Sequence, residues 1–232
     1  MRFEPELTPG TLVRRYKRFL ADVLLADGTE ITVHCPNPGS MLDVAVPGRP
    51  VALSHSTNPS RKLAYTWEMI ELERGWVGVH TGRTNSFVEE ALHQGDIEEL
   101  RDFTKLHREV RQGNSRLDFA LEQDRGPRCF VEVKNVTLTD RKRLALFPDS
   151  VTLRGQKHLR ELSNLATTGH RAVMLYWVNR GDCDGFGPAD EIDPEYGALL
   201  RRARANGVEI LAYRARVDPK QVTADTSIPI VL

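Results

Sequence analysis

Three residues in the middle of the chain carry the side chains that metal-dependent phosphate chemistry uses: Asp118, Glu132 and Lys134. Glu132 and Lys134 alternate with Val131 and Val133 in an apolar run typical of a strand. Because alternate side chains of a strand share a face, we expect the glutamate and the lysine to point the same way. If the strand that contains Asp118 pairs with this one as a hairpin, two carboxylates and one ammonium group meet on a single patch.

Two carboxylates suit Mg²⁺ or Mn²⁺, since a small divalent ion takes one or two protein carboxylates and completes its shell with water and phosphate oxygens. A bound metal lowers the pKa of water, and a lysine can stabilise negative charge that develops on a phosphate. An ordinary cross-strand ion pair would explain the same three residues. Against that alternative, Cys129–Val133 is apolar enough to be covered on both faces, where burying charges is costly without a site that needs them. The pattern alone leaves both interpretations open.

The elements that must position these residues follow from turn signals and periodicity. Before residue 81, short apolar runs alternate with turns such as Asp27-Gly28 and Pro36–Gly39, which favours a small β-barrel. After it, strands alternate with helices, which predicts an α/β domain. Domain boundaries are expected at 1–82 and 83–232. The chemistry-bearing strands are expected at 116–121 and 128–133, and helices at 85–100, from a cap at Asp149 or Ser150, and from Asp193-Pro194.

Composition excludes several classes of protein. The chain has 232 residues, of which 40% are hydrophobic, so it is neither disordered nor fibrous. It has no apolar run long enough for a membrane helix, no secretory signal pattern at its start, and three widely spaced cysteines without metal-site spacing. We expect a cytoplasmic protein. The 32 basic and 32 acidic residues cancel, although residues 139–180 hold eight Lys and Arg against three Asp and Glu. A solvated helix face explains that local surplus equally well.

The three site residues and several longer stretches of the chain resemble those of known proteins. Asp118 followed by Glu132-Val133-Lys134 resembles the D…ExK core of the PD-(D/E)xK nuclease superfamily. More narrowly, the sequence is similar to the sugar fermentation stimulation protein A family. The stretches that carry this resemblance are RYKRFLADV (15–23), HCPNPGSM (34–41), SRLDFAL (115–121), FVEVKNVTL (130–138), RGQKHLREL (154–162) and GVEILAY (207–213). The resemblance implies an α/β protein, α+β overall, with an N-terminal OB-fold-like β-barrel followed by a PD-(D/E)xK nuclease-like α/β domain.

The resemblance also assigns roles to residues. Asp118 and Glu132 match the metal-binding positions, and both belong with Lys134 to the catalytic set. Glu90 resembles an extra acidic residue that many such nucleases supply from a helix, and Gln156 matches a helical polar residue near their sites.

Two details bear on this transfer of roles. Glu89, next to Glu90, leaves the choice of acidic residue open. Pro38 stands where family members often have threonine. This difference lies in the predicted turn of the barrel and does not change the residues of the nuclease-like core.

Basic residues near aromatic ones suggest where nucleic acid would bind. OB-folds stack bases on aromatic side chains while basic groups follow the phosphates. For Tyr16 and Phe19 we favour a place in the barrel core. The candidate phosphate contacts are Arg14, Arg15, Lys17, Arg18, Arg61, Lys62, Arg154 and Lys157, with Arg160 on the same predicted helix.

The sequence therefore supports two functional hypotheses. The first is a DNA-binding protein with a Mg²⁺- or Mn²⁺-dependent phosphodiesterase site. The second is a non-catalytic DNA-binding regulator of sugar (maltose) catabolism that retains the nuclease fold. In both, the partner is DNA, bound without sequence preference as the family resemblance implies, and no membrane is involved. The oligomeric state stays open, a homodimer included.

Overall fold

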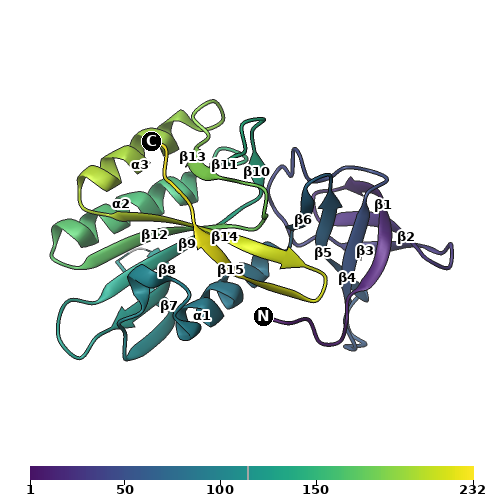
Figure 1. The fold of residues 1–232 in the computed structure, drawn as a ribbon, viewed down its shortest axis with the longest axis horizontal. Helices are drawn as coiled ribbons and strands as arrows, with labels where there is room; N and C mark the ends of the chain where they lie inside the picture. Colours follow the sequence, from purple (N-terminus) through teal and green to yellow (C-terminus); the bar gives the residue numbers. More distant parts are fainter. Residues whose placement is uncertain (114) are drawn as a thin grey trace.

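The computed structural model describes residues 1–113 and 115–232, which form a β-barrel joined to a larger α/β domain (Figure 1). The barrel strands are β1 (Thr8–Tyr16), β2 (Leu20–Leu25), β3 (Glu30–His34), β4 (Pro50–His55), β5 (Tyr65–Leu72) and β6 (Gly75–Gly78). Their order is β3-β2-β1-β4-β5-β6, and a bridge between His34 and Thr66 joins β3 to β5 and closes the barrel. The predicted OB-fold-like barrel is confirmed.

The turn between β1 and β2 corrects one expectation. Lys17 and Arg18 both have positive φ, at 46° and 64°. After this turn the Phe19 side chain is 44% exposed, with the Arg18 guanidinium 5.7 Å from its ring centroid. Phe19 is therefore not a core residue. Tyr16 is partly buried, and its hydroxyl donates a hydrogen bond to Asp22 (3.0 Å).

The second domain is built on a six-stranded mixed sheet with helices on both faces (Figure 1). The strand order is β15-β14-β12-β9-β8-β7, in which β12 is parallel to both β9 and β14 and the remaining pairs are antiparallel. Its strands are β7 (Lys105–Gln112), β8 (Ser115–Glu122), β9 (Cys129–Val136), β12 (Arg171–Val178), β14 (Glu209–Asp218) and β15 (Gln221–Ser227). A small second sheet contains β10 (Leu138–Thr139), β11 (Leu144–Phe147) and β13 (Gly185–Pro188).

Two buried hydrophobic clusters pack the helices against the two faces of the six-stranded sheet. On one face, α1 (Thr84–Gln94) packs with the sheet through residues such as Phe87 and Val131. On the other, α2 (Leu153–Thr167) and α3 (Pro194–Ala205) pack through residues such as Leu159 and Leu200. The α1-side cluster also contains residues of the barrel, so the domains share part of one core. No helix in the described part of the chain is long and apolar enough to cross a membrane.

Helix ends differ from expectation in two places. The expected helix over 85–100 stops at Gln94, because Gly95 adopts a left-handed C-cap with φ 73°, and a separate turn of 3₁₀ helix follows at Glu98–Leu100. Another such turn, Thr81–Arg83, precedes α1. Helix α2 is capped by Thr152, whose side chain accepts a hydrogen bond from the backbone N–H of Gly155, and not by Asp149 or Ser150. The predicted cap at Asp193 is confirmed.

Candidate functional site

The two predicted carboxylates meet where β8 and β9 part. The strands pair antiparallel up to Phe119 and Val131. Just beyond this last pair, the Oδ2 atom of Asp118 accepts a hydrogen bond from the backbone N–H of Val133 at 2.8 Å. The Asp118 side chain therefore takes the place of the next backbone hydrogen bond between the two strands. This contact holds the Asp118 carboxylate against the segment that contains Glu132.

Glu132 is the buried centre of the site. Its side chain is 3% exposed, and its Oε1 atom accepts hydrogen bonds from both the Lys134 ammonium and the Nδ1–H of His158 on α2. Its Oε2 atom is buried and has no hydrogen-bond partner within the described residues. The predicted strand alternation is confirmed here, since Val131 and Val133 lie in the opposite, α1-side core. One face of β9 thus presents a carboxylate with an unused oxygen.

The environment shifts the pKa values of the two carboxyl groups in opposite directions. Burial, and then the negative charge of Glu132, raise the pKa of Asp118. Burial alone would also raise the pKa of Glu132, but the charges and hydrogen bonds of Lys134 and His158 outweigh burial and lower it. Lys134 and His158 therefore compensate the negative charge of Glu132. The negative charge of Asp118 is poorly compensated unless a further cation binds.

Helix α1 supports the site through its first turn. The amide Nδ2 of Asn85 donates to Asp118 Oδ1 at 2.8 Å. Thr84 Oγ1 donates to the Oδ1 of Asn135 at 3.0 Å, and Asn179 Nδ2 donates to the same oxygen at 3.2 Å. These residues and His158 were not predicted from the sequence. Their signal was weak, because each is a single polar residue whose contact depends on how a helix docks on the sheet.

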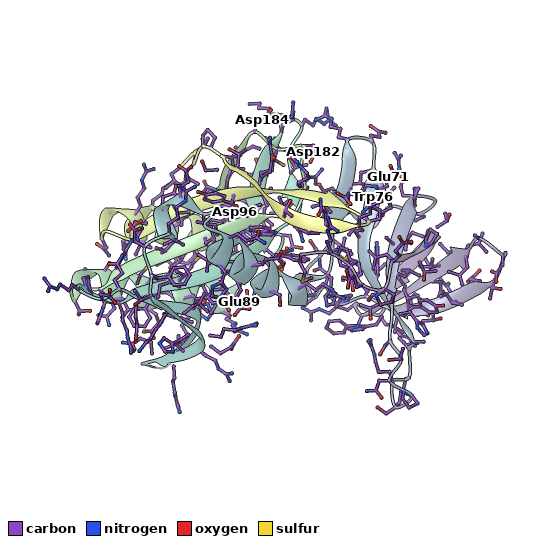
Figure 2. All side chains as sticks on the ribbon, turned by 60° about the horizontal axis from the view of Figure 1, so that its bottom comes forward. Glu71, Trp76, Glu89, Asp96, Asp182 and Asp184 are labelled. Carbon is purple, nitrogen blue, oxygen red and sulfur yellow. The ribbon has the colours of Figure 1, made fainter. Side chains whose placement is uncertain are left out.

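Glu90, which was predicted for the catalytic set, makes its contacts outside the site. Glu90 forms an ion pair with the Met1 ammonium at 2.9 Å and accepts a hydrogen bond from Gln94, because it lies about 100° around α1 from its neighbour Glu89. Glu89, labelled on α1 in Figure 2, pairs with Arg108 of β7 at 2.9 Å.

The polar group that α2 contributes also differs from the prediction. Gln156 is buried against α3, where its amide donates to both carboxylate oxygens of Asp193 (3.0 and 3.2 Å). His158, two residues further along the helix, faces the site in its place.

The predicted phosphate contacts divide into structural and solvent-facing groups. Arg14 pairs with Asp22 (2.8 Å), and Arg61 donates to Thr66 (2.9 Å). Arg15 donates to the backbone carbonyls of Arg18, Asn37, Gly39 and Ser40, so it organises the loop after β3. Lys17, Lys62, Arg154 and Lys157 are exposed, while the exposed Arg160 pairs with Glu195 (3.0 Å). Of this set, Arg18 and Arg154 line a groove between the two domains, and Lys134 lines the same groove.

The donor set fits a small divalent cation. The described residues gather no group of three or more His, Cys, Asp or Glu side chains that could hold a metal alone. The site offers the carboxylates of Asp118 and Glu132, and the Oε2 atom of Glu132 is buried without a hydrogen-bond partner among the described residues. This pair matches an ion that binds one or two carboxylates and completes its shell with water and phosphate oxygens. Asp118 and Glu132 are therefore the residues that would hold it.

Comparisons with known proteins cover both domains. Residues 13–79 match the family model described as SfsA N-terminal OB domain, and residues 82–221 match the Sugar fermentation stimulation protein RE domain. The sugar fermentation stimulation protein homolog of Geobacter metallireducens is 55% identical over 100% of both chains, and that of Pelobacter propionicus is 52% identical over 98% of this chain and 99% of its own. The solved structure of Pyrococcus furiosus SfsA in complex with Ca²⁺ superposes with a TM-score of 0.90 and 26% identity, covering 100% of this chain and 98% of that one.

Proposed function

This chain belongs to the sugar fermentation stimulation protein family, and we propose that it is a divalent-metal-dependent nuclease that acts on DNA. One observation carries the proposal. The Asp118 and Glu132 carboxylates lie together at the end of the β8–β9 pair, Lys134 is bonded to Glu132, and the Glu132 Oε2 atom is buried without a partner. A protein that only bound DNA would gain nothing from carboxylates placed where phosphates approach.

Mg²⁺ or Mn²⁺ is the proposed cofactor, held by Asp118 and Glu132. When bound, such an ion supplies an activated water and neutralises charge on the phosphate. A related protein, P. furiosus SfsA, was solved in complex with Ca²⁺, which has the same preference for oxygen ligands.

The residues of the chain itself hold and orient the reacting groups. Lys134 keeps its ammonium beside the Glu132 carboxylate, where it can donate to a phosphate oxygen as negative charge increases there. His158 donates to Glu132 from the protein side and fixes the orientation of that carboxylate. Asn85 and the backbone N–H of Val133 fix Asp118 in the same way.

The test is cleavage of end-labelled single- and double-stranded DNA and RNA by the purified chain in EDTA, Mg²⁺ or Mn²⁺. We expect metal-dependent cutting of DNA that Asp118→Asn and Lys134→Ala each reduce by about a hundredfold or more. Lys134→Ala should leave DNA binding largely intact, because its loss removes a charge that acts mainly on the reacting phosphate.

The matched control is Asp124→Asn, an exposed aspartate in the turn that joins the same two strands, and it should cut like the unaltered protein. Undiminished cutting by Asp118→Asn would place the activity outside this site. DNA binding without cutting in every metal would instead support a non-catalytic regulator.

A further inference from the structure

A groove of about 570 Å³ lies between the two domains and reaches the candidate site. The barrel contributes Arg18 and the loop Asn37–Gly39, and α1 contributes Thr84 and Asn85. Other lining residues come from the end of β9, including Lys134 and Asn135, and from the segment Phe147–Thr152 with Arg154. Asn85 and Lys134 also form hydrogen bonds with the two site carboxylates, so a molecule in the groove would lie next to the candidate site.

The groove is preformed, because several contacts hold its walls together. Ser40 Oγ donates to the backbone carbonyl of Asp149 at 2.7 Å, and the backbone N–H of Met41 donates to its carboxylate at 3.3 Å. Thr81 Oγ1 donates to the carbonyl of Pro36 at 2.8 Å. Gly39 lies so close to Asp149 that a Cβ atom would come within 2.2 Å of its Oδ2. The walls are therefore set by direct contacts, and those of Gly39, Ser40 and Met41 with Asp149 cross the domain boundary.

The charge of the groove is positive although the chain is neutral. Its lining contains Arg18, Lys134 and Arg154 and a single acid, Asp149. Within the described residues, Arg154 has neither a hydrogen bond nor an ion pair, and Arg18 uses only its Nε atom as a donor, to the carbonyl of Pro38 (2.8 Å). One guanidinium group from the barrel and one from α2 are thus open to an anionic ligand.

Groups suited to bases accompany these charges. Phe19, 44% exposed, lies outside the lining but packs against Arg18, and Val151 in the lining is 64% exposed. The Asn135 Oδ1 atom already accepts two hydrogen bonds, which fixes the amide and leaves its NH₂ group as a donor. Exposed aromatic and apolar surface beside cations is the combination that binds unpaired nucleotides.

The size of the groove decides which form of nucleic acid enters. About 570 Å³ lies within the range of about 300–1,000 Å³ that holds a single small ligand, and one or two nucleotides are of that size. A base-paired helix is much wider. Resting on the proposed function, we infer that the groove binds a single-stranded segment of nucleic acid and that both domains form this one site.

The test is binding of a fluorescein-labelled 20-mer, measured by anisotropy with Ca²⁺ in place of Mg²⁺ at several salt concentrations. The probe is presented as single-stranded DNA, as the same sequence in RNA, and as a blunt DNA duplex. We expect either single strand to bind at least tenfold more tightly than the duplex. Arg18→Glu and Arg154→Glu should each weaken that binding about tenfold and reduce the salt slope by about 0.7, the value for one lost phosphate contact on a single strand.

The matched control is Arg125→Glu, which makes the same charge change in the exposed turn before β9, at the opposite end of that strand from the groove. It should bind like the unaltered chain, and equal melting temperatures of all variants will establish that each is folded. Equal binding of duplex and single strand, or an unchanged salt slope in both groove variants, overturns the inference. Neither result bears on the proposed nuclease, which depends on whether Asp118→Asn loses metal-dependent cleavage.

Discussion

Asp118 and Glu132 are neighbours with opposite pKa shifts, and these shifts predict opposite effects on stability. The pKa of Asp118 is raised by burial and by Glu132, so its contribution to stability is present at low pH and is lost as the pH rises through the raised pKa. The pKa of Glu132 is lowered, because Lys134 and His158 outweigh burial. Its contribution is present near neutral pH and is lost as the pH falls through the lowered pKa.

Asp118→Asn should therefore raise the melting temperature in EDTA at pH 8, and the gain should disappear near pH 4. Asparagine can keep both existing hydrogen bonds if the amide of Asn85 turns round. A change of about 1 kcal/mol corresponds to about 2–4 °C for a chain of this length. Mg²⁺ should raise the melting temperature of the unaltered chain and not that of the variant. Glu132→Gln, measured in parallel by differential scanning fluorimetry, should be destabilising, and a lower melting temperature for Asp118→Asn at pH 8 would contradict the assignment.

The positions of single side chains were predictable from sequence only where strand alternation decides them. The period of two identified Glu132 and Lys134 as sharing a face, and the hairpin added Asp118. Helical residues were harder, because one position along a helix is a rotation of about 100°. Glu90 and Gln156 were chosen by resemblance, and the phase of each helix directs them away from the site, while it directs His158 towards Glu132.

At the scale of elements, the loop after β3 holds the barrel against the α/β domain through its contacts with Asp149. Arg15 gathers its carbonyl groups, and Gly39 packs against Asp149. The sequence predicted a turn at Pro36–Gly39, but it also predicted that Arg15 contacts phosphate. Its carbonyl partners lie 22 to 25 residues away for Asn37, Gly39 and Ser40, beyond what local pattern can reveal.

Gly39→Ala should destabilise the protein by about 1–3 kcal/mol, because the new methyl group would overlap the Asp149 carboxylate. Urea unfolding measures this. Gly181→Ala is the matched control, since the nearest atom to a Cβ there is 3.8 Å away. In Gly39→Ala/Asp149→Ala the overlap is removed, so the double variant should lose less than the sum of the two single losses. Strict additivity would show that this contact does not set the position of the loop.

At the scale of the whole molecule, Arg180 is a buried cation that contacts both domains. Its guanidinium bonds to Asp43 of the barrel (3.0 Å), to Asp182 (2.6 Å) and to the carbonyl of Thr137 (2.6 Å), and the residue is 4% exposed. Burial raises the pKa of Asp43 even though Arg180 opposes that shift, whereas at Asp182 Arg180 outweighs burial and lowers the pKa.

Arg180→Ala should cost about 3–5 kcal/mol near pH 8, since it leaves two partly buried carboxylates without their cation. The cost should be smaller near pH 4, where these carboxyl groups take up protons more readily. Denaturant unfolding at both pH values measures the difference. Arg201→Ala, which breaks an exposed pair with Asp190, should cost less than about 1 kcal/mol at either pH. Equal losses for Arg180→Ala at both pH values would contradict the role given to the ion pairs.

The two-domain architecture was predictable from sequence, whereas the groove between the domains was not. Turn spacing and the change to a helical period separated barrel from α/β domain. The groove depends on contacts such as Ser40 with Asp149, 109 residues apart, and on Asp43 with Arg180, 137 apart. No local pattern encodes the relative position of two folded units, and the net charge of zero concealed the positive lining.

The core that the two domains share constrains how such chains can evolve. Ala52 and Met69 of the barrel pack in the same buried cluster as Phe87 of α1 and Trp177 of β12. Recombination that replaced the barrel with a foreign one at residue 80 would expose part of this cluster and leave the new surface mismatched. Changes of substrate preference are therefore expected to arise by point substitution along the groove, with the two domains inherited as a single unit.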